Sequence, residues 1–243
     1  MQVLTETVLR ASHPERGGTV TVSKDAFITE TARRYAEERG IRIVCSEWGS
    51  MTRKKIDTKT DFPYIDAESG EKYREKPEGM THISANRLVK KNHPRIAFRG
   101  KLDYLQSEII LLQYECDKYG EKGMLGKLTE LLELSRTVLA CEVKDEALPE
   151  FRLFGMDAQQ LRHASHDVVE SMGMEHPIPD YRMGILCAKL NRLRTIVRET
   201  ELYAVNAFPD DERKDIVLAL NRMSSAVYLM FLESVKKRSA KEI

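Results

Sequence analysis

Two arginines and a glutamate near the C-terminal end of the sequence are spaced so that they could hold an anion. Arg194, Arg198 and Glu201 stand at i, i+4 and i+7, so on a helix they share a sector of about 60°. Neighbouring arginines repel each other unless an anion joins them, and guanidinium groups match the geometry of phosphate oxygens. Spacing alone favours the alternative, a solvated helix face with a local Arg198–Glu201 ion pair.

A second set of polar residues repeats this spacing in the middle of the chain. Arg99, Asp103 and Gln106 are either held by a local Arg99–Asp103 pair, or they place Asp103 where it meets an arginine of another helix. The pair Lys90–Lys91 precedes this segment. Two adjacent lysines are usually solvated, but beside a nucleotide they would supply positive charge for its phosphates.

Polar residues also interrupt apolar helical segments further along. Asn221, Ser225 and Tyr228 form a line that either makes interhelical hydrogen bonds or faces a ligand. His163 and His166 are three residues apart, which two metal ligands could use, but no third ligand is obvious nearby. The sequence therefore favours ordinary core or surface histidines at these two positions.

Composition excludes several classes of protein. The 243 residues carry a net charge of +1, which argues against a nucleic-acid binder and against attraction to an acidic membrane surface. No apolar run reaches the ~18 residues of a membrane span, and the N-terminus lacks a secretory h-region, so we expect a cytoplasmic protein. The four isolated cysteines predict free thiols. P-loop, GxGxxG, GxSxG and HExxH motifs are absent, so a nucleotide would not be held by a P-loop.

The chain divides into three predicted parts. Residues 1–45 form a small strand-helix-strand appendage, in which Thr29 caps the helix and Gly40 ends it. Residues 46–80 are polar and interrupted by glycine and proline, which predicts a loop or linker. Residues 81–243 are predicted to be helical throughout, with Ser84 capping a short first helix.

The fold class that follows is all-α, a five-helix bundle core with the small N-terminal appendage. Apolar residues recur at helical period in these segments: 95–118, 124–142, 157–172, 182–207 and 212–237. On the first of them the stripe consists of Phe98, Leu102, Leu105, Ile109, Leu112 and Cys116. Helices of this length make a bundle of ordinary size.

Several segments in the same order resemble one family. RTIVRETE (194–201), LNRMSSAVYLM (220–230) and GKLDYLQSEI (100–109) are similar to stretches of the propanediol-utilisation type of ATP:cobalamin adenosyltransferase. THISANRLVKKNHPRIAFRGKLD, LRTIVRETE and ALNRMSSAVYLM resemble the ethanolamine-utilisation branch still more closely. The resemblance implies an enzyme that transfers the 5′-deoxyadenosyl group of ATP to the cobalt of cobalamin.

The resemblance also implies roles for individual residues. Asp103 matches an aspartate that pairs across a subunit interface with an arginine, here Arg194, and these two residues are expected to be catalytic together with Arg198 and Glu201. Arg198 and Glu201 match residues that hold the triphosphate and its Mg2+. The remaining ATP-binding positions that the resemblance implies are Thr81, His82, Ser84, Lys91 and Asn221. The family pattern TRTGDKG is absent around Thr81–Ser84.

Two departures from the family concern the corrinoid and the metal. Where the propanediol type has a phenylalanine before a P-G-G turn, this chain has His176 in HPIPDY, so either His176 or Ile178 and its neighbours line the corrinoid site. Relatives in the ethanolamine branch bind a transition metal through a histidine and a CC-x-x-C cluster. Residues 46–80 contain neither cysteine nor histidine, so we expect Mg2+ with ATP near Glu201 and no metal held by a Cys/His cluster.

The implied assembly is a homotrimer with ATP and corrinoid between subunits. A flavoprotein reductant and proteins of a bacterial microcompartment are the further partners expected, and neither nucleic acid nor a membrane is. The competing hypothesis is a non-enzymatic bundle, which would be a corrinoid carrier or a microcompartment scaffold docked through residues 1–45. That hypothesis predicts no ATP binding.

Overall fold

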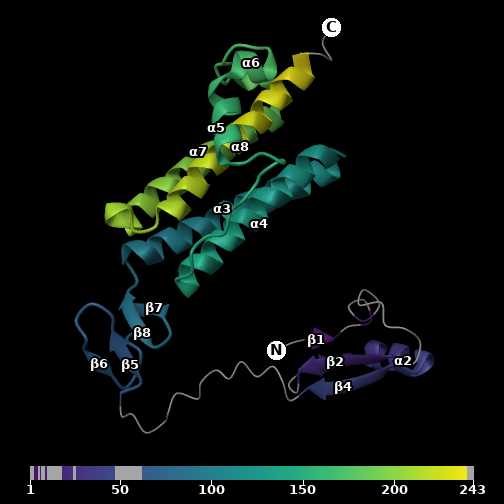
Figure 1. The fold of residues 1–243 in the computed structure, drawn as a ribbon, viewed down its shortest axis with the longest axis vertical. Helices are drawn as coiled ribbons and strands as arrows, with labels where there is room; N and C mark the ends of the chain where they lie inside the picture. Colours follow the sequence, from purple (N-terminus) through teal and green to yellow (C-terminus); the bar gives the residue numbers. More distant parts are fainter. Residues whose placement is uncertain are drawn as a thin grey trace. The chain divides into compact units, whose positions relative to one another are not determined.

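The computed structural model describes residues 3–4, 6, 9, 18–23, 26–46 and 62–239 of the chain. It divides the chain into two compact units, Met1–Pro63 and Tyr64–Ile243, each of which has a hydrophobic core (Figure 1). Each unit is described by itself.

The first unit contains the predicted strand-helix-strand. β2 (Thr19–Ser23) pairs in parallel with β4 (Arg42–Ser46), and α2 (Glu30–Arg39) connects them. The N-terminal β1 (Val3–Leu4) pairs in parallel with β3 (Phe27–Ile28). The helix begins and ends as predicted, because Thr29 Oγ1 accepts the Ala32 N–H and Gly40 adopts a left-handed conformation with φ 65°.

The second unit begins with a four-stranded sheet that the sequence did not predict. Its strands are β5 (Tyr64–Asp66), β6 (Lys72–Tyr73), β7 (Met80–Ser84) and β8 (Arg87–Lys90), in the order β6-β5-β8-β7. β5 and β8 run parallel, whereas β5–β6 and β7–β8 are antiparallel pairs.

The sheet corrects two expectations. The linker interpretation of residues 46–80 is wrong for 64–80, and residues 47–61 lie outside the described residues. Ser84 ends a strand and caps no helix, so residues 81–90 are not helical. The strands were missed because they have only two to five residues, and because glycine and proline between them indicated loops.

The rest of the second unit is the helix bundle. The long helices are α3 (Pro94–Lys118), α4 (Lys122–Lys144), α7 (Ile185–Ala207) and α8 (Lys214–Ser239). α3 packs against α4 and α7, and α7 packs against α8 (Figure 1). The predicted helix 157–172 is two short ones, α5 (Ala158–His166) and α6 (Val168–Met172), because Asp167 has non-helical angles of φ −101° and ψ 65°. The 3-10 turns η1 (Tyr181–Met183) and η2 (Pro209–Asp211) precede α7 and α8.

The predicted apolar stripes form the core of this bundle. All six stripe residues of α3 are buried, and α8 buries Ile216, Leu220, Met223, Val227 and Met230 completely. Among the described helices, α8 is the one long and apolar enough to cross a membrane. The core helix of a soluble protein can have the same length and composition, and 56% of the most apolar 18-residue stretch of α8 is buried inside the protein. The helical bundle class is therefore confirmed.

A buried carboxylate joins α3, α4 and the sheet. Glu142 of α4 is fully buried and accepts hydrogen bonds from Arg95 Nε at 2.7 Å and from Arg99 Nε. Arg99 also donates to the main-chain carbonyls of Ile83 at 2.9 Å and His82 at 3.3 Å. The local Arg99–Asp103 pair considered from the sequence is therefore not formed, because Arg99 turns to a carboxylate 43 residues away.

Candidate functional site

A pocket of about 930 Å³ lies between α7, α8, the end of α5 and the segment that follows α6. It brings together six residues that the sequence placed in the site from three separate stretches of the chain. These residues are His176, Ile178, Arg194, Arg198, Glu201 and Asn221. Ser165, His166, Thr195, Leu202, Ser224, Ser225 and Tyr228 are among the other lining residues.

One wall of the pocket is cationic. Arg194 and Arg198 both project from α7, and neither guanidinium contacts a carboxylate within the described part of the chain. Arg194 lies over the Tyr228 ring, 5.0 Å from its centroid. The Arg198–Glu201 pair considered from the sequence is not formed, because Glu201 Oε1 accepts the side-chain N–H of Asn221 at 2.8 Å. The donor groups of both arginines are therefore left for an anion.

The Asn221 side chain is held at both ends. Its Nδ2 donates to Glu201, and its Oδ1 accepts from Nη1 of the neighbouring Arg222. Burial, followed by the positive charge of Arg162, lowers the pKa of Arg222, and the Glu201 carboxylate opposes this shift. Because Arg222 occupies the amide oxygen, the amide nitrogen of Asn221 is directed to Glu201.

Another part of the pocket lining is built on Tyr228 and His176. The Tyr228 hydroxyl lies 2.7 Å from His176 Nδ1, and the two rings are stacked with centroids 5.9 Å apart and planes 13° apart. His176 Nε2 lies 3.3 Å from the His166 main-chain oxygen. Burial raises the pKa of Tyr228, and the charge of Arg194 acts in the opposite direction. The polar line on α8 therefore does both things considered from the sequence, since Asn221 makes an interhelical hydrogen bond to Glu201 of α7 and Tyr228 faces the pocket.

The other predicted site residues lie elsewhere in this chain. Thr81, His82 and Ser84 are on β7, and Lys91 follows β8, where its Nζ pairs with Glu78 Oε1 at 2.9 Å. Asp103 is exposed on α3 and its carboxylate contacts no other residue that the structure describes. None of these five residues lines the pocket of Arg194.

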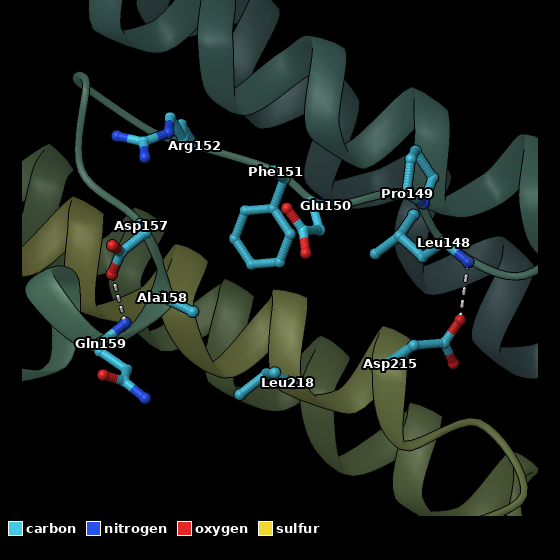
Figure 2. A pocket seen from close by; sticks show the side chains of 10 residues that line it. All are labelled: Leu148, Pro149, Glu150, Phe151, Arg152, Asp157, Ala158, Gln159, Asp215 and Leu218. Carbon is cyan, nitrogen blue, oxygen red and sulfur yellow. Dashed lines mark hydrogen bonds between the residues drawn. The ribbon is translucent and has the colours of Figure 1, made fainter.

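A different pocket, of about 650 Å³, is unsuited to a phosphate chain. It lies between residues 148–159 and α8, and Glu150, Asp157 and Asp215 give it acidic walls (Figure 2). Figure 2 shows Asp215 accepting the main-chain N–H of Leu148 and Asp157 capping α5. The arginine of its lining, Arg152, donates to the Gly155 carbonyl at 3.0 Å. These contacts stabilise the loop.

The thiols and histidines named in the sequence analysis have ordinary environments. Cys116, Cys141 and Cys187 are free and buried, as predicted, and the side chain of Cys45 lies outside the described residues. His163 does not gather with His166. It instead lies near Asp167 and Glu170 at the corner between α5 and α6, with all three side chains exposed.

Among the pocket residues, Ser165, Thr195 and Ser224 had no role predicted from the sequence, and the contact between Tyr228 and His176 was not predicted either. Tyr228 lies on α8 and His176, 52 residues earlier, lies in the segment after α6, so no local spacing signals their pairing. The polarity of position 228 within an apolar helix was the only available sign.

Comparison with known proteins identifies the family. A family model described as cobalamin adenosyltransferase matches residues 72–233. The chain is 30% identical to the corrinoid adenosyltransferase EutT of Salmonella typhimurium, over 96% of this chain and 92% of that protein. It is 29% identical to EutT of Escherichia coli K12, over 97% and 93% of the two chains.

A solved structure shares the fold. It is a variant of the PduO-type ATP:corrinoid adenosyltransferase from Lactobacillus reuteri complexed with cobalamin and ATP, with a TM-score of 0.51 and 19% identity. The likeness covers 64% of this chain and 91% of that one. The resemblance in the sequence is thus confirmed in both sequence and fold, and the chain belongs to the cobalamin adenosyltransferase family.

Proposed function

We propose that this protein transfers the 5′-deoxyadenosyl group of ATP to the cobalt of a corrinoid, and that the pocket of Arg194 and Arg198 holds the triphosphate. The observation that carries the assignment is the pair of pocket arginines without a carboxylate partner among the described residues. A polyphosphate supplies the negative charge that this wall lacks.

In the proposed reaction, reduced Co(I) attacks C5′ of ATP. Its electron pair forms the Co–C bond, the C5′–O bond breaks, and triphosphate leaves with the bonding electrons. Cobalt is oxidised formally from Co(I) to Co(III). The step needs no protein nucleophile or base, so the pocket would only have to bind and orient the two substrates. Arg194 and Arg198 would position the triphosphate and stabilise the charge that grows on the leaving oxygen.

The pocket also suits Mg2+ bound together with the nucleotide. Magnesium prefers oxygen ligands, and it is usually held by one or two carboxylates and by substrate phosphates. Glu201 has one oxygen occupied by Asn221, and its other oxygen contacts none of the described residues. Glu201 would therefore hold the ion, whose charge neutralises phosphate oxygens when it is bound.

The corrinoid would lie against His176 and Ile178 of the same pocket. Ile178 is 85% exposed, which leaves an apolar side chain free to contact a large ring. The ethanolamine-utilisation branch named by the sequence motifs suggests that the adenosylcobalamin serves ethanolamine catabolism. We accordingly propose a cytoplasmic enzyme that receives its electrons from a flavoprotein and associates with a microcompartment.

A second copy of the chain would complete the site. On α3 an exposed stripe at helical spacing runs from Asp103 through Ser107 and Ile110 to Tyr114, and Ile110 and Tyr114 are 47% and 67% exposed. α7 exposes Leu202 beside the arginines, at 68%. Burying these unlike apolar surfaces against each other would bring Asp103 of one copy to Arg194 of the next.

Such head-to-tail contacts close into a ring when the rotation between copies is that of a closed symmetry, and a threefold rotation would give the homotrimer. The same contact would carry the sheet of the partner copy toward the pocket, because the sheet is fixed to α3 through Arg99. Thr81, His82, Ser84 and Lys91 would then reach the nucleotide from the neighbouring subunit.

One experiment tests both the reaction and the shared site. Adenosylcobalamin formation is followed by absorbance after ATP is added to reduced cobalamin and protein. We expect Arg198→Ala and Asp103→Ala each to lose at least about 100-fold in turnover, the size expected for loss of a group that stabilises the leaving charge. The exposed Arg136 of α4 provides the matched control Arg136→Ala, which should remain active.

Mixing the two inactive variants, with exchange of subunits, should restore part of the turnover, because some interfaces then combine an intact Asp103 with an intact Arg198. Full activity of Arg198→Ala would remove the triphosphate assignment. Failure of the mixture to recover, with subunit exchange verified by mass spectrometry, would remove the shared site and leave the reaction standing.

A further inference from the structure

The feature that carries a further inference is the contact between Tyr228 and His176. Tyr228 contacts two other residues of the pocket lining, since the Arg194 guanidinium lies 5.0 Å from its ring centroid and its hydroxyl lies 2.7 Å from His176 Nδ1. The ring also stacks on Phe231 of the bundle core, with centroids 6.1 Å apart. Tyr228 is therefore held from the core side while its hydroxyl reaches His176.

The two partners of His176 determine where its proton lies. A neutral imidazole has one N–H and one nitrogen lone pair. Nε2 lies 3.3 Å from the main-chain oxygen of His166, and a carbonyl oxygen can only accept, so Nε2 carries the hydrogen. Nδ1 then carries the lone pair, and it accepts the Tyr228 O–H.

This arrangement matters because imidazole lone pairs are common metal ligands. A histidine beside the corrinoid could coordinate the cobalt through a free nitrogen. Here one nitrogen is protonated and the other is occupied by a hydroxyl. His176 can then meet the corrinoid only through the carbon edge and the faces of its ring.

We propose that Tyr228 is a positioning residue that donates a hydrogen bond to the Nδ1 lone pair of His176 and so prevents His176 from becoming a cobalt ligand. This inference rests on the proposed function. Tyr228→Phe removes the hydroxyl alone and keeps the ring that contacts Arg194 and Phe231. The freed Nδ1 can then turn to the metal. The inference thus assigns His176 the role of a wall of the corrinoid site.

The first test needs no corrinoid. Nitrogen NMR of the ligand-free protein, labelled at its six histidines and assigned with His176→Gln, reports the tautomer directly. We expect the Nε2–H form for His176 in the wild type and in the control Tyr181→Phe, which changes a tyrosine that is 85% exposed. In Tyr228→Phe the Nδ1 signal should shift. A wild-type His176 with its hydrogen on Nδ1 would overturn the proposal whatever the protein binds.

The second test uses cob(II)inamide, a corrinoid without a nucleotide base of its own, in electron paramagnetic resonance. We expect no nitrogen splitting of the cobalt signal in the wild-type complex, and a splitting from one nitrogen in Tyr228→Phe that disappears in the double variant His176→Ala/Tyr228→Phe. The inference would be refuted if the wild-type complex showed a nitrogen splitting that His176→Ala removes. It would also be refuted if Tyr228→Phe bound the corrinoid but showed no nitrogen splitting. Absence of corrinoid binding by the wild type would instead refute the proposed function.

Discussion

Two pairs of arginines at the same spacing have opposite surroundings in this molecule. Arg95 and Arg99 on α3 are four residues apart, and both bind the buried carboxylate of Glu142. Arg194 and Arg198 on α7 are also four residues apart, but they face a pocket and contact no carboxylate among the described residues. The charge of the first pair is neutralised within the fold, whereas the charge of the second pair is left for a ligand.

The comparison shows that the partner, and not the spacing, decides the role of an arginine pair. Glu142 is fully buried on another helix, so removing it would leave two guanidinium groups without their counter-charge. On α7 the carboxylate that could have played this part, Glu201, is bound to Asn221. The first pair should therefore matter for stability and the second for binding.

The largest effect on stability should come from Glu142→Gln. The change keeps the shape of the side chain but removes the charge that both α3 arginines need. Breaking a buried ion pair on one side costs about 3–5 kcal/mol, and we expect a loss of this size in the free energy of unfolding, measured by urea denaturation. The exposed Glu133 on the same helix gives the control Glu133→Gln. Equal losses in the two variants would show that the Glu142 cluster does not stabilise the fold.

An intermediate effect is expected at Asp215, which anchors the loop after α4. Its carboxylate accepts the Leu148 N–H at 2.8 Å and pairs with Arg213 at 3.1 Å. Burial acts to raise the pKa of Asp215, but the bonds from Arg213 and from the main-chain N–H groups of Leu148 and Ile216 outweigh it, so the pKa is lowered. The ionised form is therefore the one that stabilises the folded state.

Because the folded-state pKa lies below the ordinary value of about 4, the contribution of Asp215 is fully present above that value and is lost as the pH falls through the folded-state pKa. Asp215→Asn should cost about 1.5–3 kcal/mol at pH 7, as expected for hydrogen bonds to a charged group. Urea denaturation at neutral pH and below pH 4 should show the difference from wild type shrinking in acid. A difference that grows in acid would contradict the assignment.

The smallest effect on stability is expected for Arg198→Ala. Like charges four residues apart on a helix destabilise it by about 0.2–0.5 kcal/mol, so removing one should leave the free energy of unfolding unchanged or slightly higher. Thermal denaturation with Mg2+ and ATP should separate binding from folding, because ATP should raise the melting temperature of the wild type and raise that of the variant much less. A loss above about 1 kcal/mol without ATP would mean that Arg198 supports the fold after all.

The sequence correctly predicted the features that depend on the periodic spacing of residues along a single helix. The apolar stripe of α3 is buried as predicted, and the i, i+4, i+7 spacing correctly placed Arg194, Arg198 and Glu201 on one face of α7. The same rule failed for Arg99, whose partner comes from the next helix. Contacts between residues far apart in sequence are set by how the elements pack, and no local pattern encodes them.

Asp103 shows a different limit. Its position on α3 was predicted, but a single chain leaves it exposed, so the role proposed for it would require a surface of another copy. The four-stranded sheet was missed for a third reason. Its strands are too short for period-two alternation to stand out between the glycines and prolines that separate them.

The attachment of the sheet to α3 has a consequence for how this family can diverge. Arg99 donates hydrogen bonds to the main-chain carbonyl oxygens of His82 and Ile83 on β7. Every amino acid has such an oxygen. Substitutions along β7 can therefore accumulate while the strand stays docked, as long as Arg99 and Glu142 persist. A strand attached in this way can change its side chains over evolution without being displaced from its helix.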